Sequence, residues 1–348
     1  MLSDFSRLNR RMHNKSLTAD SVASIVGGRN VGNEYFSFES NVEFGDFDLL
    51  LYGNTVTDTA DQFDRYWNNQ HAIPIDFIHP SDKALSLQTM RNWFEDSRLQ
   101  TLFSQGRYDF RQLDFYQKLF DNSLPLNWGR AQLWVDDPNK VLHHSSELIT
   151  LLQNELAQFE HSLMIISPYF VPTERGTQWL VDAAQQGKKI TIVTNSLASN
   201  DVFAVHGWYA KYRQALLSAG IELWETKANA QTQNQWSVSG SSRSSLHAKI
   251  MLFDQRKLLV GSMNFDPRSA SLNTEMAVMI EHPDYTAMSV DKVMGYLPSI
   301  AYQLHLVDNE VQWHDLKDGD VFTSEPQASI WRKIGAWFSG LLPIESQL

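Results

Sequence analysis

The feature that most constrains this 348-residue chain is a pattern of polar residues that occurs twice. One copy begins in the segment HNKSLTAD near the start of the chain, and the other in HAKIMLFD some 230 residues later. The shared residues, at identical spacing, are His13, Lys15 and Asp20 in the first copy and His247, Lys249 and Asp254 in the second. A spaced pattern that recurs at such a distance indicates an internal duplication.

Two further parts of the pattern recur downstream of each histidine. Gly27 and Asn30 in GGRN match Gly261 and Asn264 in GSMN at the same offset. An acidic residue then heads an apolar run, Asp46 in DFDLLL and Glu275 in EMAVMI, after a length difference of five residues. Each copy therefore supplies a histidine, a lysine, an asparagine and an acid.

The local sequence around the second copy predicts how these side chains are presented. A β-strand over 246–253 would place His247 and Lys249 on one face and apolar residues on the other, because strand side chains alternate. A short strand over 257–260 and a tight turn at Gly261 would then bring Asn264 to the same place. We expect one face of this segment to be core and the other to carry chemistry.

The doubled pattern resembles that of the phospholipase D superfamily. The segments GSMNFDPRSASLNTE, ISPYFVP and LPIESQL are similar to those of bacterial cardiolipin synthases of the phospholipase D type. The resemblance spans almost the whole chain. It implies an α/β protein with two repeated α/β/α sandwich domains and an active site at their pseudo-two-fold interface.

The two copies differ in what precedes them, which predicts the domain organisation. Twelve residues precede His13, whereas about a hundred residues of alternating helix and strand precede His247 in its own repeat. We expect an incomplete, N-terminally truncated first repeat at 1–70, a mostly helical insertion or linker at 71–140, a second repeat at 141–310 and a C-terminal tail at 311–348. A sheet that began at His13 would have an unpaired edge, unless another chain or a later segment covers it.

Periodicity predicts the remaining elements. A helix over 56–67 would bury Ala60, Phe63 and Trp67. The insertion would hold helices over 82–104 and 109–120. In the second repeat Ser146 would cap a helix, and a β-α-β-α-β alternation predicts a largely parallel sheet with helices on both faces. The aromatic residues at 35, 36 and 38 would either fill the core or line a lipid-binding cleft.

Composition narrows the function classes. The net charge of −11 argues against a general nucleic-acid binder, since such proteins gain affinity from basic surface. The chain has no cysteine and no run of eighteen apolar residues, so neither disulfides nor a transmembrane helix is expected. The tail IWRKIGAWFSGLLPIESQL has an apolar helical face beside Arg332 and Lys333. It would either rest at a bilayer interface or pack on the protein body.

The paired residues suit chemistry at a phosphodiester. Lysines and asparagines donate to the phosphate oxygens, and two histidines divide nucleophilic attack and proton transfer. The resemblance names His13 as the nucleophile and His247 as the general acid and base. From strand position we expect Asp46 to hold the far ring nitrogen of His13, and Glu275 that of His247.

Other residues of the pattern receive lesser roles. Asp20 and Asp254 follow their strands in turns, which predicts structural roles through hydrogen bonds to backbone. Ser262, Arg268 and His206 are possible substrate contacts. Gly28 stands where the second repeat has Ser262, so a serine contact to phosphate would be missing on one side.

The resemblance implies a phosphatidyltransferase, a cardiolipin synthase that moves a phosphatidyl group onto phosphatidylglycerol through a phosphohistidine. The expected partners are phospholipids and a membrane surface, peripherally on the cytoplasmic side of the bacterial cytoplasmic membrane. No cofactor, no metal and no nucleic acid are expected. The alternatives are a phospholipase D-type phosphodiesterase or nuclease, and an inactive truncated fragment.

Overall fold

The computed structural model describes residues 9–36, 43–78, 86–95, 114–143, 145–229 and 244–348. These fall into two compact units. The larger unit comprises Met1–Tyr66 and Gly129–Leu348, and the smaller comprises Trp67–Trp128. All residues of the duplicated pattern belong to the larger unit.

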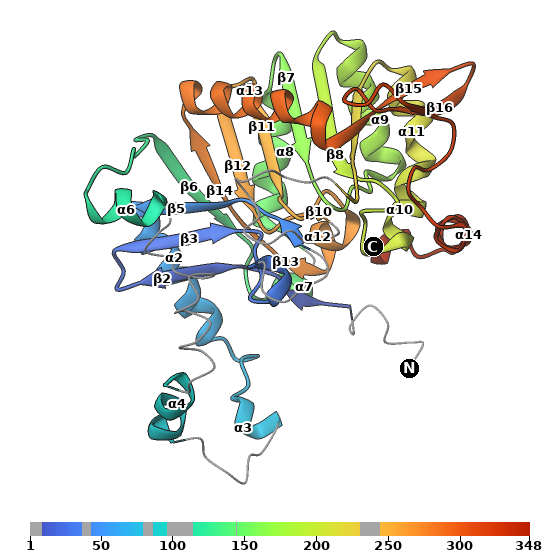
Figure 1. The fold of residues 1–348 in the computed structure, drawn as a ribbon. Coiled ribbons are helices and arrows are strands. Elements are labelled where there is room, and N and C mark those ends of the chain that lie inside the picture. Colours follow the sequence, from blue (N-terminus) through green and yellow to red (C-terminus); the bar gives the residue numbers. More distant parts are fainter. Residues whose placement is uncertain (1–8, 37–42, 79–85, 96–113, 144, 230–243) are drawn as a thin grey trace. The chain divides into compact units, whose positions relative to one another are not determined.

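A ten-stranded sheet forms the framework of the larger unit (Figure 1). In spatial order its strands are β17 (Val321–Phe322), β16 (Glu310–His314), β15 (Ala301–Val307), β9 (Glu222–Thr226), β8 (Lys189–Asn195), β7 (Ser162–Ile166), β11 (Ile250–Phe253), β12 (Lys257–Gly261), β14 (Met276–Glu281) and β6 (Arg130–Val135). Only β7, β8 and β9 pair in parallel, and the other pairings in this sheet are antiparallel. The prediction of a largely parallel sheet is therefore wrong beyond these three strands. The strands that follow His247 and Lys249 in sequence, β11, β12 and β14, pair with one another in antiparallel fashion.

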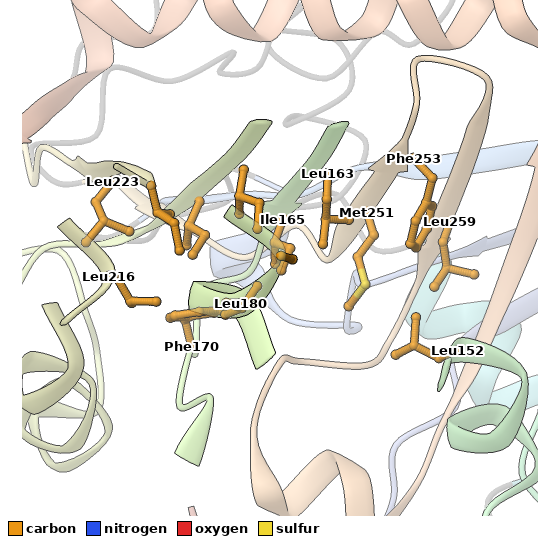
Figure 2. Close-up of a cluster of buried hydrophobic side chains, with 14 of the residues drawn as sticks. Leu152, Leu163, Ile165, Phe170, Leu180, Leu216, Leu223, Met251, Phe253 and Leu259 are labelled. Carbon is orange, nitrogen blue, oxygen red and sulfur yellow. The ribbon is translucent and has the colours of Figure 1, made fainter. Parts of the chain in front are cut away.

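Helices cover one face of this sheet and enclose the main apolar core. The covering helices are α8 (Glu147–Gln158), α9 (Thr173–Gln185), α10 (Phe203–Tyr209) and α11 (Arg213–Ser218). Figure 2 shows Leu152, Leu180 and Leu216 from these helices against strand residues such as Ile165. The predicted cap of α8 is confirmed, since the Ser146 hydroxyl accepts the Ile149 N–H at 3.0 Å.

The first repeat packs on the opposite face of the sheet. Its strands β2 (Ser16–Ala19), β3 (Ala23–Gly27) and β5 (Asp48–Tyr52) form a separate three-stranded sheet, followed by α2 (Asn54–Trp67). Val26 and Leu49 share a second core with Val260 and with Leu297 of α13 (Pro283–Ile300). The α/β fold built from two packed repeats is thus as predicted.

The sheet of the first repeat is smaller than that of the second. Within the described residues β2 pairs only with β3, whereas its counterpart β11 pairs with both β12 and β7. Leu17 on β2 is 67% exposed. In these residues β2 is therefore an edge strand, and it presents apolar surface to solvent.

Three details of the sequence prediction need correction. Helix α2 buries Val56, Thr59 and Gln62 rather than the aromatic side, and Phe63 and Trp67 are exposed. Strand β6 belongs to the large sheet, so the insertion ends before it instead of at 140. Strands β16 and β17 likewise extend the sheet into the predicted tail as far as Phe322.

The regular structure in the described part of the smaller unit is helical. Its helices are α3 (Ile75–Ile78), α4 (Leu87–Phe94) and α6 (Asp114–Phe120). Most of the rest of the predicted helices over 82–104 and 109–120 lies outside the described residues. Across the described ranges of the whole chain, no helix has both the length and the apolarity that a membrane crossing requires.

The remaining elements are mostly short. They are β1 (Arg11–Met12), β4 (Glu43–Gly45), β10 (Ser244–Leu246), β13 (Asn273–Thr274), η2 (Asn33–Tyr35), α7 (Lys140–His143), η4 (Ala210–Tyr212), α12 (Pro267–Ser271), α14 (Ile330–Ser339) and η5 (Glu345–Gln347).

Candidate active site

Two short parallel strand pairs join the repeats at the site. Strand β1, which leads to His13, pairs with β13, which leads to Glu275. Strand β10, which leads to His247, pairs in the same way with β4, which leads to Asp46. The backbone N–H of each histidine then donates across the pair, from His13 to Thr274 O at 2.9 Å and from His247 to Gly45 O at 2.7 Å. Each histidine is thereby placed beside the acid of the other repeat.

The first of these histidine–acid pairs is His13 with Glu275. Nδ1 of His13 lies 2.9 Å and 3.1 Å from the two carboxylate oxygens. Glu275 is fully buried, while the His13 side chain is 23% exposed. Burial alone would raise the pKa of Glu275, but His13 and the hydroxyls of Ser262 and Ser269 hold it below the usual value. A carboxylate in this position fixes one tautomer of the ring and leaves Nε2 facing the site.

The second pair is His247 with Asp46. Nδ1 of His247 lies 2.6 Å from Asp46 Oδ2, and the histidine side chain is only 10% exposed. Burial and the neighbouring Lys249 ammonium lower the pKa of His247 to about 4, against the opposing effect of Asp46. The ring is therefore neutral in the ligand-free protein at ordinary pH.

These pairs correct the expected assignment, which joined Asp46 to His13 and Glu275 to His247. That assignment took each acid from the histidine's own repeat. In the structure the strand pairs β1–β13 and β4–β10 cross between repeats, so each acid serves the other repeat's histidine. Neither half of the duplicated pattern can form its histidine–acid pair alone.

The expected continuous strand over 246–253 is also interrupted. His247 to Lys249 lie between β10 and β11, and Lys249 Nζ donates back to the His247 carbonyl at 2.5 Å. Lys15 Nζ makes the matching bond to the His13 carbonyl at 2.8 Å. The break lets the strand change partners, from the other repeat before the histidine to its own repeat after the lysine.

Two lysine cations lie beside the two acids, Lys249 buried and Lys15 half-buried. Burial lowers the pKa of Lys249 to about 7 and that of Lys15 to about 8. Asp46 and Glu275 oppose both shifts through their charges. Two such ammonium groups in one pocket favour an anionic ligand, which would restore their full charge.

The two asparagines have different surroundings. Asn30 Nδ2 donates to the Tyr35 hydroxyl at 2.8 Å, and this hydroxyl lies 3.2 Å from His247 Nε2. Asn264 is buried, and its Oδ1 has no hydrogen-bond partner in the described part of the chain. Burial, with smaller effects from nearby carboxylates, raises the pKa of Tyr35 to about 12. Tyr35 is thus a neutral donor at the face of His247, and the sequence had offered it only as core filling or a cleft residue.

Ser262 does not face the site as expected. It is fully buried, and its hydroxyl donates to Glu275 Oε2 at 2.5 Å. At the matching position of the first repeat, a Cβ on Gly28 would lie 2.5 Å from Asp46 Oδ1. The Ser262 hydroxyl therefore bonds the acid beside it, and the absence of a side chain at Gly28 leaves room for Asp46.

Arg268 and His206 are the other expected substrate contacts, and neither reaches the histidine pair. The Arg268 guanidinium donates to Asn9 O at 3.1 Å, and its backbone N–H donates to Leu348 O at 2.6 Å. His206 is buried in a separate ionic cluster, with Arg213 and Glu325 as its partners.

That ionic cluster is the one group of acids and histidine close enough to hold a metal within the described residues. Potential ligand atoms of His206, Glu225 and Glu325 lie within 4.8 Å of one another. The Arg213 guanidinium already stands among them, 2.8 Å from Glu225 and 2.7 Å from Glu325. A guanidinium that already pairs with both carboxylates fits a structural role for the cluster.

The turn aspartates behave differently in the two repeats. Asp254 accepts the backbone N–H groups of Glu160, His161 and Ser162 at 2.7–2.8 Å, which ties its turn to the start of β7. These bonds give Asp254 the structural role expected of it. Asp20 lies in an exposed turn of the same left-handed backbone conformation, φ 51° against 52°.

Several positioning residues escaped the sequence analysis. Asn195, at the end of β8, holds both backbone groups of Leu246 through contacts of 2.9 Å and 3.0 Å, which fixes the residue before His247. Asp136 accepts the Glu275 N–H at 3.1 Å and is paired with Lys140 at 2.7 Å. A polar residue at the carboxyl end of a parallel strand was the available signal for Asn195.

The fold and the two crossed pairs define a protein of the phospholipase D type, and comparisons with known proteins agree. A family model described as "Cardiolipin synthase, PLD-like domain" matches residues 152–294. Cardiolipin synthase C of Escherichia coli (strain K12) is 36% identical over 357 residues, covering 99% of this chain and 74% of the relative. A cardiolipin synthase of Clostridium perfringens is 25% identical over 276 residues, covering 79% and 47%.

A solved structure supports the fold. The crystal structure of phosphatidylserine synthase from Haemophilus influenzae matches with a TM-score of 0.57 at 15% identity. The match covers 86% of this chain and 65% of that one. The chain belongs to the cardiolipin synthase family of the phospholipase D superfamily.

Proposed function

We propose that this chain is a phosphatidyltransferase that forms cardiolipin by moving a phosphatidyl group onto phosphatidylglycerol. The observation that carries the proposal is the pair of crossed histidine–acid contacts, His13 with Glu275 and His247 with Asp46, flanked by the half-buried Lys15 and the buried Lys249. Family membership and the cardiolipin synthase names of its relatives point to the lipid substrate.

In the first step the donor phosphodiester lies between the two histidines. His13 Nε2 attacks phosphorus, the bond to the donor's headgroup oxygen breaks, and a phosphatidyl–histidine forms. Lys15, Lys249, Asn30 and Asn264 donate to the phosphate oxygens, whose negative charge would otherwise repel the nucleophile. His13 suits the attack because no residue in the described part of the chain bonds its Nε2 and its side chain is the more exposed of the two.

His247 handles the protons in both steps. It gives a proton to the departing headgroup oxygen, which leaves as an alcohol. It then takes the proton of the phosphatidylglycerol headgroup hydroxyl as that oxygen attacks the phosphatidyl–histidine. The ligand-free ring is neutral, so it must gain its proton as substrate binds. An anionic phosphodiester beside His247 and Lys249 favours this, because it offsets the lysine's charge.

Glu275, Asp46 and Tyr35 orient the histidine rings through hydrogen bonds. Glu275 and Asp46 hold the Nδ1 protons, so that each Nε2 points at phosphorus or at the moving proton. The Tyr35 hydroxyl, held between Asn30 and His247 Nε2, stands where an oxygen of the substrate would bind. Substrate replaces this contact with its own oxygen.

The acceptor separates a transferase from a phospholipase. Purified protein is incubated with phosphatidylglycerol vesicles, and the lipids are extracted and analysed by mass spectrometry. The proposal predicts cardiolipin and released glycerol, both lost in a His13→Ala variant. Phosphatidic acid without cardiolipin, at high lipid concentration, would show hydrolysis instead and overturn the proposal. Peripheral association with a membrane is part of it, since the substrate is a bilayer lipid.

A further inference from the structure

The C-terminal helix α14 carries a solvent-exposed apolar surface that the proposed chemistry does not use. Trp331 is 78% and Trp337 68% exposed, although both are large apolar side chains. The α14 apolar surface, as we call it, consists of Ile330, Trp331, Ile334, Trp337, Phe338 and Leu341. Large exposed patches of this kind mark interaction sites.

The helix is held firmly by its opposite side. Ala336 and Ser339 are buried against α10, where a Cβ on Gly207 would lie 2.0 Å from the Ala336 carbonyl oxygen. Only a glycine permits so close a helix contact. The exposed orientation of the tryptophans is therefore set by packing and is not a frayed end.

Charge indicates the kind of partner. From Ile330 to Ile344 the sequence has no acidic residue and two cations, Arg332 and Lys333, in a chain of net charge −11. Tryptophans beside cations on an otherwise apolar helix face are typical of segments that lie in a bilayer interface rich in anionic headgroups.

Contacts along the chain connect this surface to the active site. Arg332 donates to the carbonyls of Leu197 and Asn200, in the loop after β8. The side chain of Asn195, at the end of the same strand, hydrogen-bonds to both backbone groups of Leu246, the residue before His247. Phe203, itself exposed, packs on Gly335 and extends the apolar surface toward that loop.

We infer that the α14 apolar surface docks on an anionic lipid bilayer and sets the mouth of the active site at the level of the headgroups. The inference rests on the proposed function, because that function supplies a reason for a bilayer at this mouth. It adds the surface by which the chain would reach its substrate.

Vesicle flotation of the full chain with phosphatidylglycerol and phosphatidylcholine vesicles tests the inference. A Trp331→Gln/Trp337→Gln variant should bind phosphatidylglycerol vesicles at least about tenfold more weakly, because two interfacial anchors are lost. The Trp331→Phe/Trp337→Phe variant should keep most of the binding. A matched control is Trp128→Gln, whose side chain is 73% exposed outside α14 and whose loss should change binding by less than about twofold.

Lys333→Gln should weaken binding to phosphatidylglycerol vesicles about fivefold and leave binding to phosphatidylcholine vesicles unchanged. Turnover of a short-chain phosphatidylglycerol below its micelle concentration should be unaffected by the tryptophan changes. Unchanged vesicle binding in the glutamine variant would overturn the inference, as would equal losses on soluble and vesicle substrate. If the wild type bound vesicles through α14 but made no cardiolipin, the proposed function would fail while the docking surface stood.

Discussion

The two halves of the active site have the same parts in different surroundings. His13 is partly exposed and its acid, Glu275, receives hydrogen bonds from Ser262, Ser269 and Asn273. His247 is almost enclosed, and its shorter acid, Asp46, receives only the Phe47 N–H besides the ring within the described residues. The duplicated sequence thus gives one partly exposed histidine and one nearly enclosed histidine whose pKa is lowered to about 4. The two halves of a duplicated motif can therefore have unequal roles when the side chains around them differ.

The largest expected effect comes from removing either histidine. His13→Ala and His247→Ala should each lower turnover on the order of 10⁴-fold or more, and the double variant should be little worse than either. Both act on one phosphodiester, so their losses do not add. Turnover measured on the three variants checks this, and additive losses would show that the halves work independently.

The crossed pairing predicts a specific double-variant pattern. Asp46→Asn and Glu275→Gln should each cost about 10²- to 10⁴-fold in kcat, because a wrongly held ring presents the wrong tautomer. Asp46→Asn should add little to His247→Ala, and in Asp46→Asn the imidazole NMR signals of His247, and not those of His13, should shift. Coupling of Asp46 to His13 instead of His247 would contradict the structure.

The buried lysines predict a loss of activity at alkaline pH. A lysine whose pKa is lowered to about 7 or 8 is charged below that value and neutral above it. The value of kcat/KM, which reports the free enzyme, should therefore fall as the pH rises from 7 to 9. In Lys249→Arg the side chain at this position stays charged throughout this pH range. The fall in kcat/KM of this variant should therefore begin at a higher pH than in the wild type. A flat profile in the wild type between pH 6 and 9 would refute this reasoning.

The smallest expected effects distinguish the supports of the two acids. Gly28→Ala places a methyl group against Asp46 Oδ1 and should disturb the His247 half, with a loss of activity of about tenfold and no gain from a phosphate contact. Ser262→Ala removes a donor from the buried Glu275 and should lower the free energy of unfolding by about 1–3 kcal/mol. Thermal unfolding and steady-state kinetics separate the two. A raised KM in Ser262→Ala, with an unchanged free energy of unfolding, would instead show that this serine contacts the substrate.

The sequence predicted the parts of the site and not their partners. Spacing and the duplication identified the histidines, lysines, asparagines and acids, because each lies at a fixed offset within its own copy. The pairing of β1 with β13 and of β4 with β10 joins residues 200 or more positions apart, and no local periodicity reports it. The acids were therefore assigned within each repeat, which was wrong.

The same limit explains the other differences. The parallel strands β7, β8 and β9 followed from alternation of helix and strand, whereas β16 and β17 extend the sheet through antiparallel pairings into the segment predicted as tail. His206 was considered for the cleft because a helix position does not reveal that Arg213 and Glu325 enclose it. Tyr35 ends the short 3-10 helix η2, and only the three-dimensional arrangement shows that it meets His247.

The central claim is that both halves build one site in which His13 is the nucleophile. The direct measurement is rapid acid-free quenching of the full chain with phosphatidylglycerol labelled at phosphorus, followed by mapping of the labelled peptide by mass spectrometry. We expect a phosphatidyl–histidine at His13, absent in His13→Ala and accumulating in His247→Ala. Label at His247, or turnover to cardiolipin with no labelled histidine in either variant, would contradict it.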